Sequence, residues 1–154
     1  MTAGAGRSSV VACDNCGRPN RLPVIAEGIP RCAVCHHPLA WIVEAGDATF
    51  GGAIAASVPV LVDFWADWCG PCRMVSPLVE RIGHDYAGRL KVVKLDTEAA
   101  PQIAARFQIR SIPLLVLFRD GAEVARLVGA HPDAQLRAWL DGQLAASTTA
   151  TGSA

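Results

Sequence analysis

The stretch from Val60 to Arg73 constrains the fold of this chain more than any other part of the sequence. It reads VLVDFWADWCGPCR, an apolar run followed by a Cys-Gly-Pro-Cys tetrapeptide. An apolar run without alternation is typical of a strand buried on both faces of a sheet. We therefore expect a central strand over residues 59–66 that leads through a Cys-x-x-Cys turn into a helix.

The two thiols of this turn, Cys69 and Cys72, are three residues apart. At a helix start they meet within the first turn, close enough to form and break a disulfide. The helix N-terminus favours negative charge, which stabilises a thiolate at Cys69. A Cys-x-x-Cys pair alone is ambiguous between zinc binding and redox chemistry. The strand before it, the helix after it and the Gly-Pro interior favour a redox pair.

Four further cysteines form two more Cys-x-x-Cys pairs, Cys13 with Cys16 and Cys32 with Cys35, with fifteen residues between the pairs. This spacing predicts a zinc ribbon, in which four thiolates close a tetrahedral site with sulfurs at about 2.3 Å from the metal. The residues between the pairs include too few apolar side chains for a core, so we expect one zinc ion to hold the module. Two disulfides are the alternative. The spacing, and residues 1–11 without an export signal, argue against them.

Composition excludes several classes of function. Fourteen basic residues balance fourteen acidic ones, and the few arginines of the cysteine-rich module are too weak a basic excess to indicate nucleic-acid binding. No apolar run approaches the ~20 residues of a membrane span. His36 and His37 follow the last thiol of the module. Because four cysteines already complete a structural site, we interpret both histidines as exposed rather than as ligands.

Strand and helix patterns alternate along the rest of the chain. We expect strands at 39–44, 59–66, 91–96, 112–118 and 123–128, and helices at 47–56, 69–87, 99–107 and from 132 or 133 to 146. Asp47 is the predicted N-cap of the first helix, and Asp120-Gly121 is the predicted turn between the last two strands. The small and polar residues 1–9 and 147–154 are expected to be disordered.

The segment Trp68-Cys69-Gly70-Pro71-Cys72, with Asp63-Phe-Trp-Ala before it, is similar to the active site of the thioredoxin family. The resemblance covers about residues 39–146. It implies an α/β thioredoxin fold, with a mixed central sheet and helices on both faces. Together with a zinc ribbon at 10–38, the whole chain resembles the zinc-ribbon subclass of that family.

The resemblance assigns roles to the redox pair. Cys69 is expected to attack the substrate disulfide and Cys72 to resolve the mixed disulfide. Trp68, Gly70 and Pro71 support this loop. A thioredoxin-like site has a reduction potential of about −270 mV and a thiolate whose pKa lies near ambient pH.

Asp63 lies in the middle of the apolar central strand, where an unpaired carboxylate is costly. Burial should raise its pKa, which suits a group that accepts and returns the Cys72 proton. The family motif places an acid at this position. A structural reading, in which Asp63 is paired with a cation, is also open, and Lys94 on the next strand is the candidate for that pairing.

The segment Arg-Ser-Ile112-Pro113 matches the family motif in which a cis proline lets the backbone before it pair with an extended substrate. By itself the sequence favours a trans bond, because only about 5–6% of such bonds are cis in folded proteins. Gly129 also matches, and its missing side chain is expected to keep this docking surface open. Leu114 departs from the commoner threonine of the family.

The resemblance implies a cytoplasmic protein-disulfide reductase that acts on disulfide-containing proteins. Its electron donor would be an NADPH-dependent thioredoxin reductase, and the chain itself has no nucleotide motif, so no nucleotide, nucleic-acid or membrane partner is expected. The alternative is a zinc-dependent redox sensor or holdase chaperone in which the ribbon is the functional part. We also expect the part that begins near Leu39 to fold and reduce disulfides without the ribbon.

Overall fold

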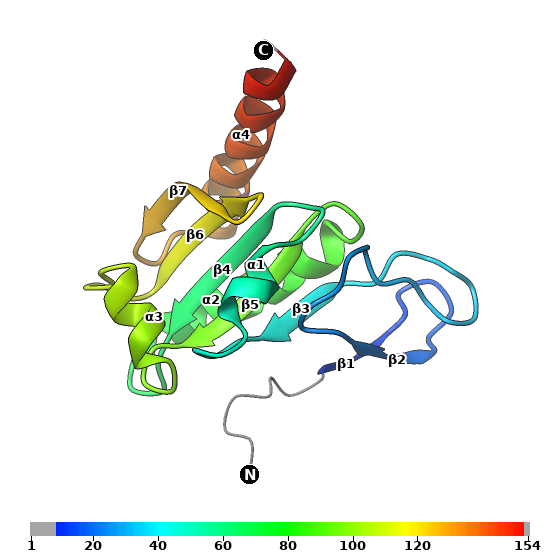
Figure 1. The fold of residues 1–154 in the computed structure, drawn as a ribbon, viewed down its shortest axis with the longest axis horizontal. Helices are drawn as coiled ribbons and strands as arrows, with labels where there is room; N and C mark the ends of the chain where they lie inside the picture. Colours follow the sequence, from blue (N-terminus) through cyan, green and yellow to red (C-terminus); the bar gives the residue numbers. More distant parts are fainter. Residues whose placement is uncertain (1–8, 153–154) are drawn as a thin grey trace.

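The structure is a computed structural model that describes residues 9–152 (Figure 1). Its elements in chain order are β1 (Ser9–Ala12), β2 (Pro19–Leu22), β3 (Trp41–Glu44), α1 (Phe50–Ile54), β4 (Val60–Trp65), α2 (Gly70–Asp85), β5 (Lys91–Asp96), α3 (Pro101–Arg106), β6 (Leu114–Arg119), β7 (Ala122–Val128) and α4 (Asp133–Gly152). From β3 onward this is the predicted order of strands and helices. No helix among these elements has the length and apolar character needed to cross a membrane.

The main sheet has five strands in the order β3-β5-β4-β6-β7, with β4 at its centre. Strands β3, β5 and β4 run parallel, whereas β6 and β7 pair antiparallel to their neighbours. The predicted hairpin turn is confirmed, because Asp120 and Gly121 join β6 to β7 with φ angles of 53° and 78°. The mixed sheet of the predicted fold is therefore present.

Helices cover both faces of this sheet. On one face α1 and α3 pack on a cluster of four phenylalanines, in which Phe50 lies 5.4 Å from Phe107 and 5.7 Å from Phe118 between ring centroids. On the other face α2 and α4 pack on Leu61, Leu115 and their neighbours. Successive residues of a strand point to opposite faces, so Asp63, two positions after Leu61, faces α2.

The cysteine-rich module packs against the first face of the sheet, beside β3 (Figure 1). Cys13, Leu22 and Cys32 are buried in the same apolar cluster as α1 and β4. A Cβ atom on Gly52 of α1 would collide with the side chain of Ile25, which shows how closely the module approaches. The ribbon and the five-stranded sheet thus share one core.

Two side chains of the sheet bind the backbone of the module. Trp41 Nε1 donates to Pro23 O at 2.8 Å, and Lys91 Nζ donates to Val24 O at 2.5 Å and to Ala53 O at 2.7 Å. The Lys91 side chain is 0% exposed, and its ammonium lies 4.2 Å from the centroid of the Trp41 ring. Burial lowers the pKa of Lys91 from 10.5 to about 8. A buried cation therefore lies between the module and the sheet.

Both predicted disordered ends differ from the structure where it describes them. Ser9 belongs to β1, and α4 continues to Gly152, six residues past the predicted boundary at 146. No Pro or Gly interrupts residues 143–151, and alanine favours the helix, so the small-residue composition was not a stop signal. The predicted disorder of residues 1–8, 153 and 154 lies outside the described residues.

The predicted cap at Asp47 is also wrong for its own helix. Thr49 occupies the N-cap position of α1 without a side-chain hydrogen bond. The Asp47 carboxylate instead accepts from the backbone N–H groups of Gln102 and Ile103, at 3.3 and 2.9 Å, in the first turn of α3. Asp47 therefore caps a helix that follows it by more than fifty residues.

Candidate redox site and metal centre

Cys69 and Cys72 form a disulfide at the N-terminus of α2, with their Cα atoms 5.3 Å apart. Cys69 is the N-cap of the helix, with extended φ and ψ of −89° and 104°, and its sulfur accepts from Cys72 N at 3.2 Å. Pro71 lies in the first turn, where a missing N–H costs no helical hydrogen bond. The predicted redox pair at a helix start is confirmed.

Side chains around the disulfide are held by contacts that the sequence did not indicate. The exposed Trp68 donates from Nε1 to Glu98 Oε1 at 2.7 Å, and Glu98 N donates to Asp96 Oδ1 at 2.9 Å. On the helix side, Arg73 Nη2 donates to Asp67 O at 3.0 Å. The Trp68–Glu98 contact joins segments thirty residues apart, so no local sequence pattern predicts it.

Asp63 is buried as predicted, at 1% exposure, on the face of β4 that α2 covers. Neither of its carboxylate oxygens has a hydrogen-bond partner among the described residues. Burial raises the pKa of Asp63 from 3.8 to about 6, the positive charge of Lys94 opposes this rise, and the negative charge of Glu80 adds to it. This is the direction expected for a carboxyl group taken out of water.

Lys94, the candidate for pairing with Asp63, lies beside it in the register of β4 and β5 but binds elsewhere. Its ammonium donates to Ser76 Oγ and to Glu80 Oε1, the latter at 3.1 Å. Its ion pair is therefore with Glu80, and Lys94 acts on Asp63 only through space. Sequence reasoning missed Ser76 and Glu80. They follow Cys72 at successive intervals of four residues on one helix, which was a readable signal.

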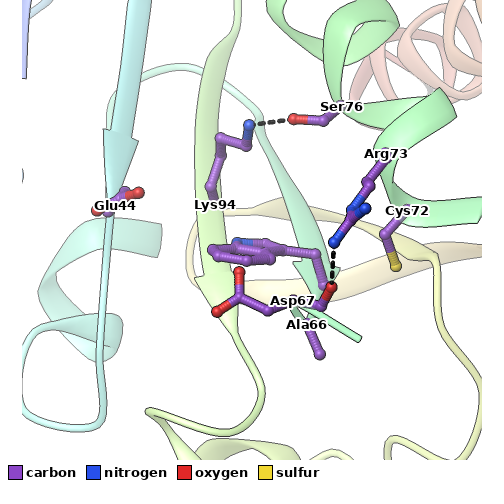
Figure 2. Close-up of a pocket in the computed structure, with 8 residues that line it drawn as sticks. Glu44, Ala66, Asp67, Cys72, Arg73, Ser76 and Lys94 are labelled. Atoms are coloured by element: carbon purple, nitrogen blue, oxygen red, sulfur yellow. Dashed lines mark hydrogen bonds between the residues drawn. The ribbon is translucent and has the colours of Figure 1, made fainter. Parts of the chain in front are cut away.

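A pocket of about 250 Å³ opens beside Cys72 and extends to β3 (Figure 2). Its lining residues are Glu44, Trp65, Ala66, Asp67, Cys72, Arg73, Ser76 and Lys94. In Figure 2 Lys94 lies between Glu44 and the α2 residues, with its ammonium directed to Ser76. Cys72 of the redox pair and Lys94, the register partner of Asp63, thus border the same pocket.

The predicted docking residues lie together in the structure. The Ile112–Pro113 bond is cis, as the resemblance implied. Gly129 N donates to Pro113 O at 2.9 Å, which joins the two segments directly. Gly129 has a φ of 92°, a conformation that other residues rarely adopt, so the backbone itself requires glycine here.

The four N-terminal cysteines also lie together, with all four sulfurs within 4.8 Å of one another. The Cys13 and Cys35 sulfurs are 3.6 Å apart and those of Cys16 and Cys32 are 3.5 Å apart. A tetrahedral zinc ion with Zn–S bonds of about 2.3 Å separates its sulfurs by about 3.8 Å. The cluster therefore fits a four-thiolate metal ion.

The two pairs form matching turns. Gly17 N donates to Cys13 O at 2.8 Å, and His36 N donates to Cys32 O at 2.9 Å. Gly17 and His36 occupy equivalent positions after the second cysteine of each pair, with φ angles of 80° and 64°. Both His36 and His37 are exposed, and the metal-ligating group found among the described residues consists of the four cysteines.

The four-cysteine module also contacts the helix of the redox site. Asp14, inside the first cysteine pair, lies 2.8 Å from His84 Nδ1 near the C-terminal end of α2. The helix that begins at the disulfide thus ends beside the four-cysteine cluster.

Comparison with known proteins identifies the class to which this fold and site belong. The family model described as Thioredoxin matches residues 41–142. The chain is similar to Thioredoxin 1 of Synechococcus elongatus, at 50% identity over 99 residues, which are 64% of this chain and 92% of that protein. It is also similar to Thioredoxin C-3 of Corynebacterium nephridii, at 40% identity over 139 residues, which are 88% of this chain and 95% of that protein.

The protein belongs to the thioredoxin family. It is a thiol–disulfide oxidoreductase whose redox-active pair is Cys69 and Cys72. Residues 39–154 make up about three quarters of the chain, whereas the match to Thioredoxin C-3 covers 88% of it. The match therefore extends into the cysteine-rich module.

Proposed function

We propose that the protein is a protein-disulfide reductase of the zinc-ribbon subclass called thioredoxin-2. The observation that carries this proposal is the presence, in one thioredoxin chain, of a disulfide at the start of α2 and a separate cluster of four cysteines ahead of the fold. The first supplies exchange chemistry, and the second has the ligand set of a closed structural zinc site.

Exchange begins at Cys69 of the reduced protein. Its thiolate attacks one sulfur of a substrate disulfide, which forms a mixed disulfide and releases the other substrate sulfur as a thiolate. The exposed fractions of Cys69 and Cys72, 3% and 4%, do not distinguish the two thiols. The N-cap position supports Cys69 as the attacking group, because the helix N-terminus and Cys72 N–H stabilise its negative charge.

Resolution then requires the Cys72 thiol to lose its proton. We assign that proton to the Asp63 carboxylate, whose raised pKa of about 6 lies near the operating pH of a general base. The Cys72 sulfur attacks the Cys69 sulfur, the Cys69–Cys72 disulfide forms, and the second substrate sulfur leaves as a thiol after taking up a proton. Two electrons pass from the protein to the substrate in this sequence.

Docking of the substrate is assigned to the backbone at Ile112, Pro113 and Gly129, on the support of the Gly129 N to Pro113 O hydrogen bond that joins these segments. Trp68, Gly70 and Pro71 form the rim around Cys69. Reduction of the disulfide is assigned to an NADPH-dependent thioredoxin reductase in the cytoplasm, on the support of family membership.

The metal of the ribbon is proposed to be one zinc ion held by Cys13, Cys16, Cys32 and Cys35. When bound, zinc would crosslink the two turns and take no part in exchange, because four thiolates leave it no open coordination position. Two backbone donors support thiolate ligands here: Asn15 N lies 3.4 Å from the Cys13 sulfur. The equivalent Val34 N lies 3.5 Å from the Cys32 sulfur.

The test is reduction of insulin disulfides with thioredoxin reductase and NADPH, with zinc measured on the same preparation. We expect turnover, one zinc per chain and two reactive thiols in the reduced metal-loaded protein. The Cys72→Ser variant should accumulate mixed disulfides with substrates on a non-reducing gel, whereas Cys69→Ser should trap none. The reverse pattern would overturn the assigned order, and six equally reactive thiols would overturn the metal assignment.

A further inference from the structure

A row of polar side chains runs along α2 from the redox site. Cys72, Ser76 and Glu80 follow one another at intervals of four residues, so they share one face of the helix. That face is turned to β5, because Lys94 of β5 contacts both Ser76 and Glu80. The row therefore lies along Lys94, which is the register partner of Asp63 on β5.

Lys94 is held along this row. Its side chain is only 14% exposed, and its ammonium donates to Ser76 Oγ (Figure 2). One turn further along α2, it also donates to Glu80 Oε1. Both contacts direct the ammonium to the helix. A lysine chain has enough freedom to direct its ammonium elsewhere, so these acceptors decide where the charge lies.

Asp63 is the acceptor that Lys94 does not reach. The two residues are side by side as register partners on the parallel strands β4 and β5. Even so, neither Asp63 oxygen accepts a hydrogen bond from any described residue. A buried carboxylate ordinarily takes a hydrogen-bonded cation when one is within reach. The missing contact therefore needs a cause, and the acceptors on α2 supply one.

We propose that Ser76 and Glu80 are positioning residues that hold the Lys94 ammonium off the Asp63 carboxylate and so keep that carboxylate free to take the Cys72 proton. The second half of this proposal rests on the acid–base role proposed above for Asp63. The first half concerns only where the ammonium lies.

Among the groups around Asp63, Lys94 is the cation that affects the pKa of its carboxyl group. On β6 the residue opposite Asp63 is the apolar Leu115. Arg73, which lines the same pocket from α2, donates to the backbone oxygen of Asp67 instead. Glu44 of β3 lines the far side of the pocket and carries negative charge. The pKa of Asp63 responds to burial first, then to Lys94, which lowers it, and to Glu80, which raises it.

The test measures the pKa of Asp63 itself, by the ¹³C shift of its carboxyl carbon in the oxidised protein. We compare Ser76→Ala, Glu80→Gln and the double variant with the wild type. A cation brought within 4–6 Å of a carboxylate lowers its pKa by about 1–3 units. The double variant should therefore lower the midpoint by about one unit. Loss of the Glu80 charge lowers the pKa of Asp63 by itself. The proposal therefore requires that Ser76→Ala alone lower the midpoint, and that the double variant lower it by more than Glu80→Gln does in a Lys94→Met background.

Two control variants separate positioning from other effects. Ser76→Thr keeps the hydroxyl and should retain the wild-type midpoint. Asp85→Asn also removes a carboxylate from α2, but its partner is Arg137 rather than Lys94, and it should leave the midpoint unchanged. A midpoint that stays fixed or rises in the double variant would overturn the proposal, and so would an equal fall in Asp85→Asn.

A kinetic readout separates this inference from the proposed function. The rate of mixed-disulfide resolution is followed against pH in the same variants, and we expect its profile to move to lower pH together with the Asp63 midpoint. If the midpoint falls while the rate profile stays in place, Ser76 and Glu80 position Lys94 as proposed, and the acid–base role of Asp63 is wrong.

Discussion

Replacing Asp63 by asparagine removes a buried charge at nearly constant volume, and its effect on stability follows from the structure. The carboxyl group is 1% exposed, and burial raises its pKa from 3.8 to about 6. Each pKa unit corresponds to 1.36 kcal/mol, so keeping Asp63 ionised in the folded state costs about 3 kcal/mol. The asparagine amide will also lack partners, which costs about 1–3 kcal/mol at every pH.

The dependence on pH identifies this effect. Because the folded pKa is the higher one, the folded state binds more protons than the unfolded state between pH 3.8 and about 6, and the wild type loses stability as pH rises through that window. Asp63→Asn lacks this loss. Its stability relative to the wild type should therefore improve by about 2–2.5 kcal/mol from pH 4 to pH 7, because part of the loss has already occurred at pH 4, and change little above that.

The assay is equilibrium unfolding of the oxidised, metal-loaded proteins in guanidinium chloride at pH 4, 5, 6, 7 and 8. Asp85→Asn is the matched control, because Asp85 is half exposed and pairs with Arg137 at the surface, where an ion pair contributes at most about 1 kcal/mol. A stability difference between Asp63→Asn and the wild type that is flat with pH would refute the reasoning, because it would mean that Asp63 titrates normally.

Three further predictions concern the ribbon. The unfolding free energy of the wild type should rise between pH 8 and pH 10, because the folded pKa of Lys91 lies below its unfolded value of 10.5. The rise should amount to up to about 3 kcal/mol, and Lys91→Met should remove most of it in urea titrations across that range. His36→Gly should stabilise the metal-loaded protein by about 0.5–1 kcal/mol, since glycine adopts the φ of 64° without strain. A chelator titration should show tighter metal retention, and an equal gain in stability of the metal-free protein would contradict an origin of the gain at the metal-binding turn. A chain that starts at Leu39 leaves Lys91 without its Val24 acceptor, so we expect it to fold with a clearly lower thermal midpoint than the full chain. An unchanged midpoint would show that the shared core adds no stability.

Short-range patterns were enough to predict the elements and the chemistry of the redox pair. The apolar run before Cys69 gave the central strand, and Asp120-Gly121 gave the hairpin because both residues accept positive φ angles. The cysteine spacing gave the cluster of four sulfurs. In each case the residues that decide the structure are neighbours in the sequence, or carry a rare side chain whose pairing has few alternatives.

Contacts between distant segments were beyond the reach of these patterns. Asp47 reads as a cap for the helix that follows it, and only the folded chain brings it to the start of α3. Lys94 reads as a partner for Asp63, but α2 offers two better acceptors. By its sequence, the ribbon has too few apolar residues for a core of its own. In the structure it packs against apolar surface that belongs to another part of the chain.

The close packing of the ribbon has a consequence for how such a module can be gained, lost or transplanted. Gly52 and Gly88 both lie where a Cβ atom would meet ribbon side chains, from Ile25 in one case and from Pro38, at 3.1 Å, in the other. Lys91 is tolerated in the interior because Val24 offers it a carbonyl. An engineer who grafts residues 9–38 onto a shorter thioredoxin must therefore also change the recipient at the positions of Gly52 and Lys91, where the recipient alone gives no reason for glycine or for a buried lysine.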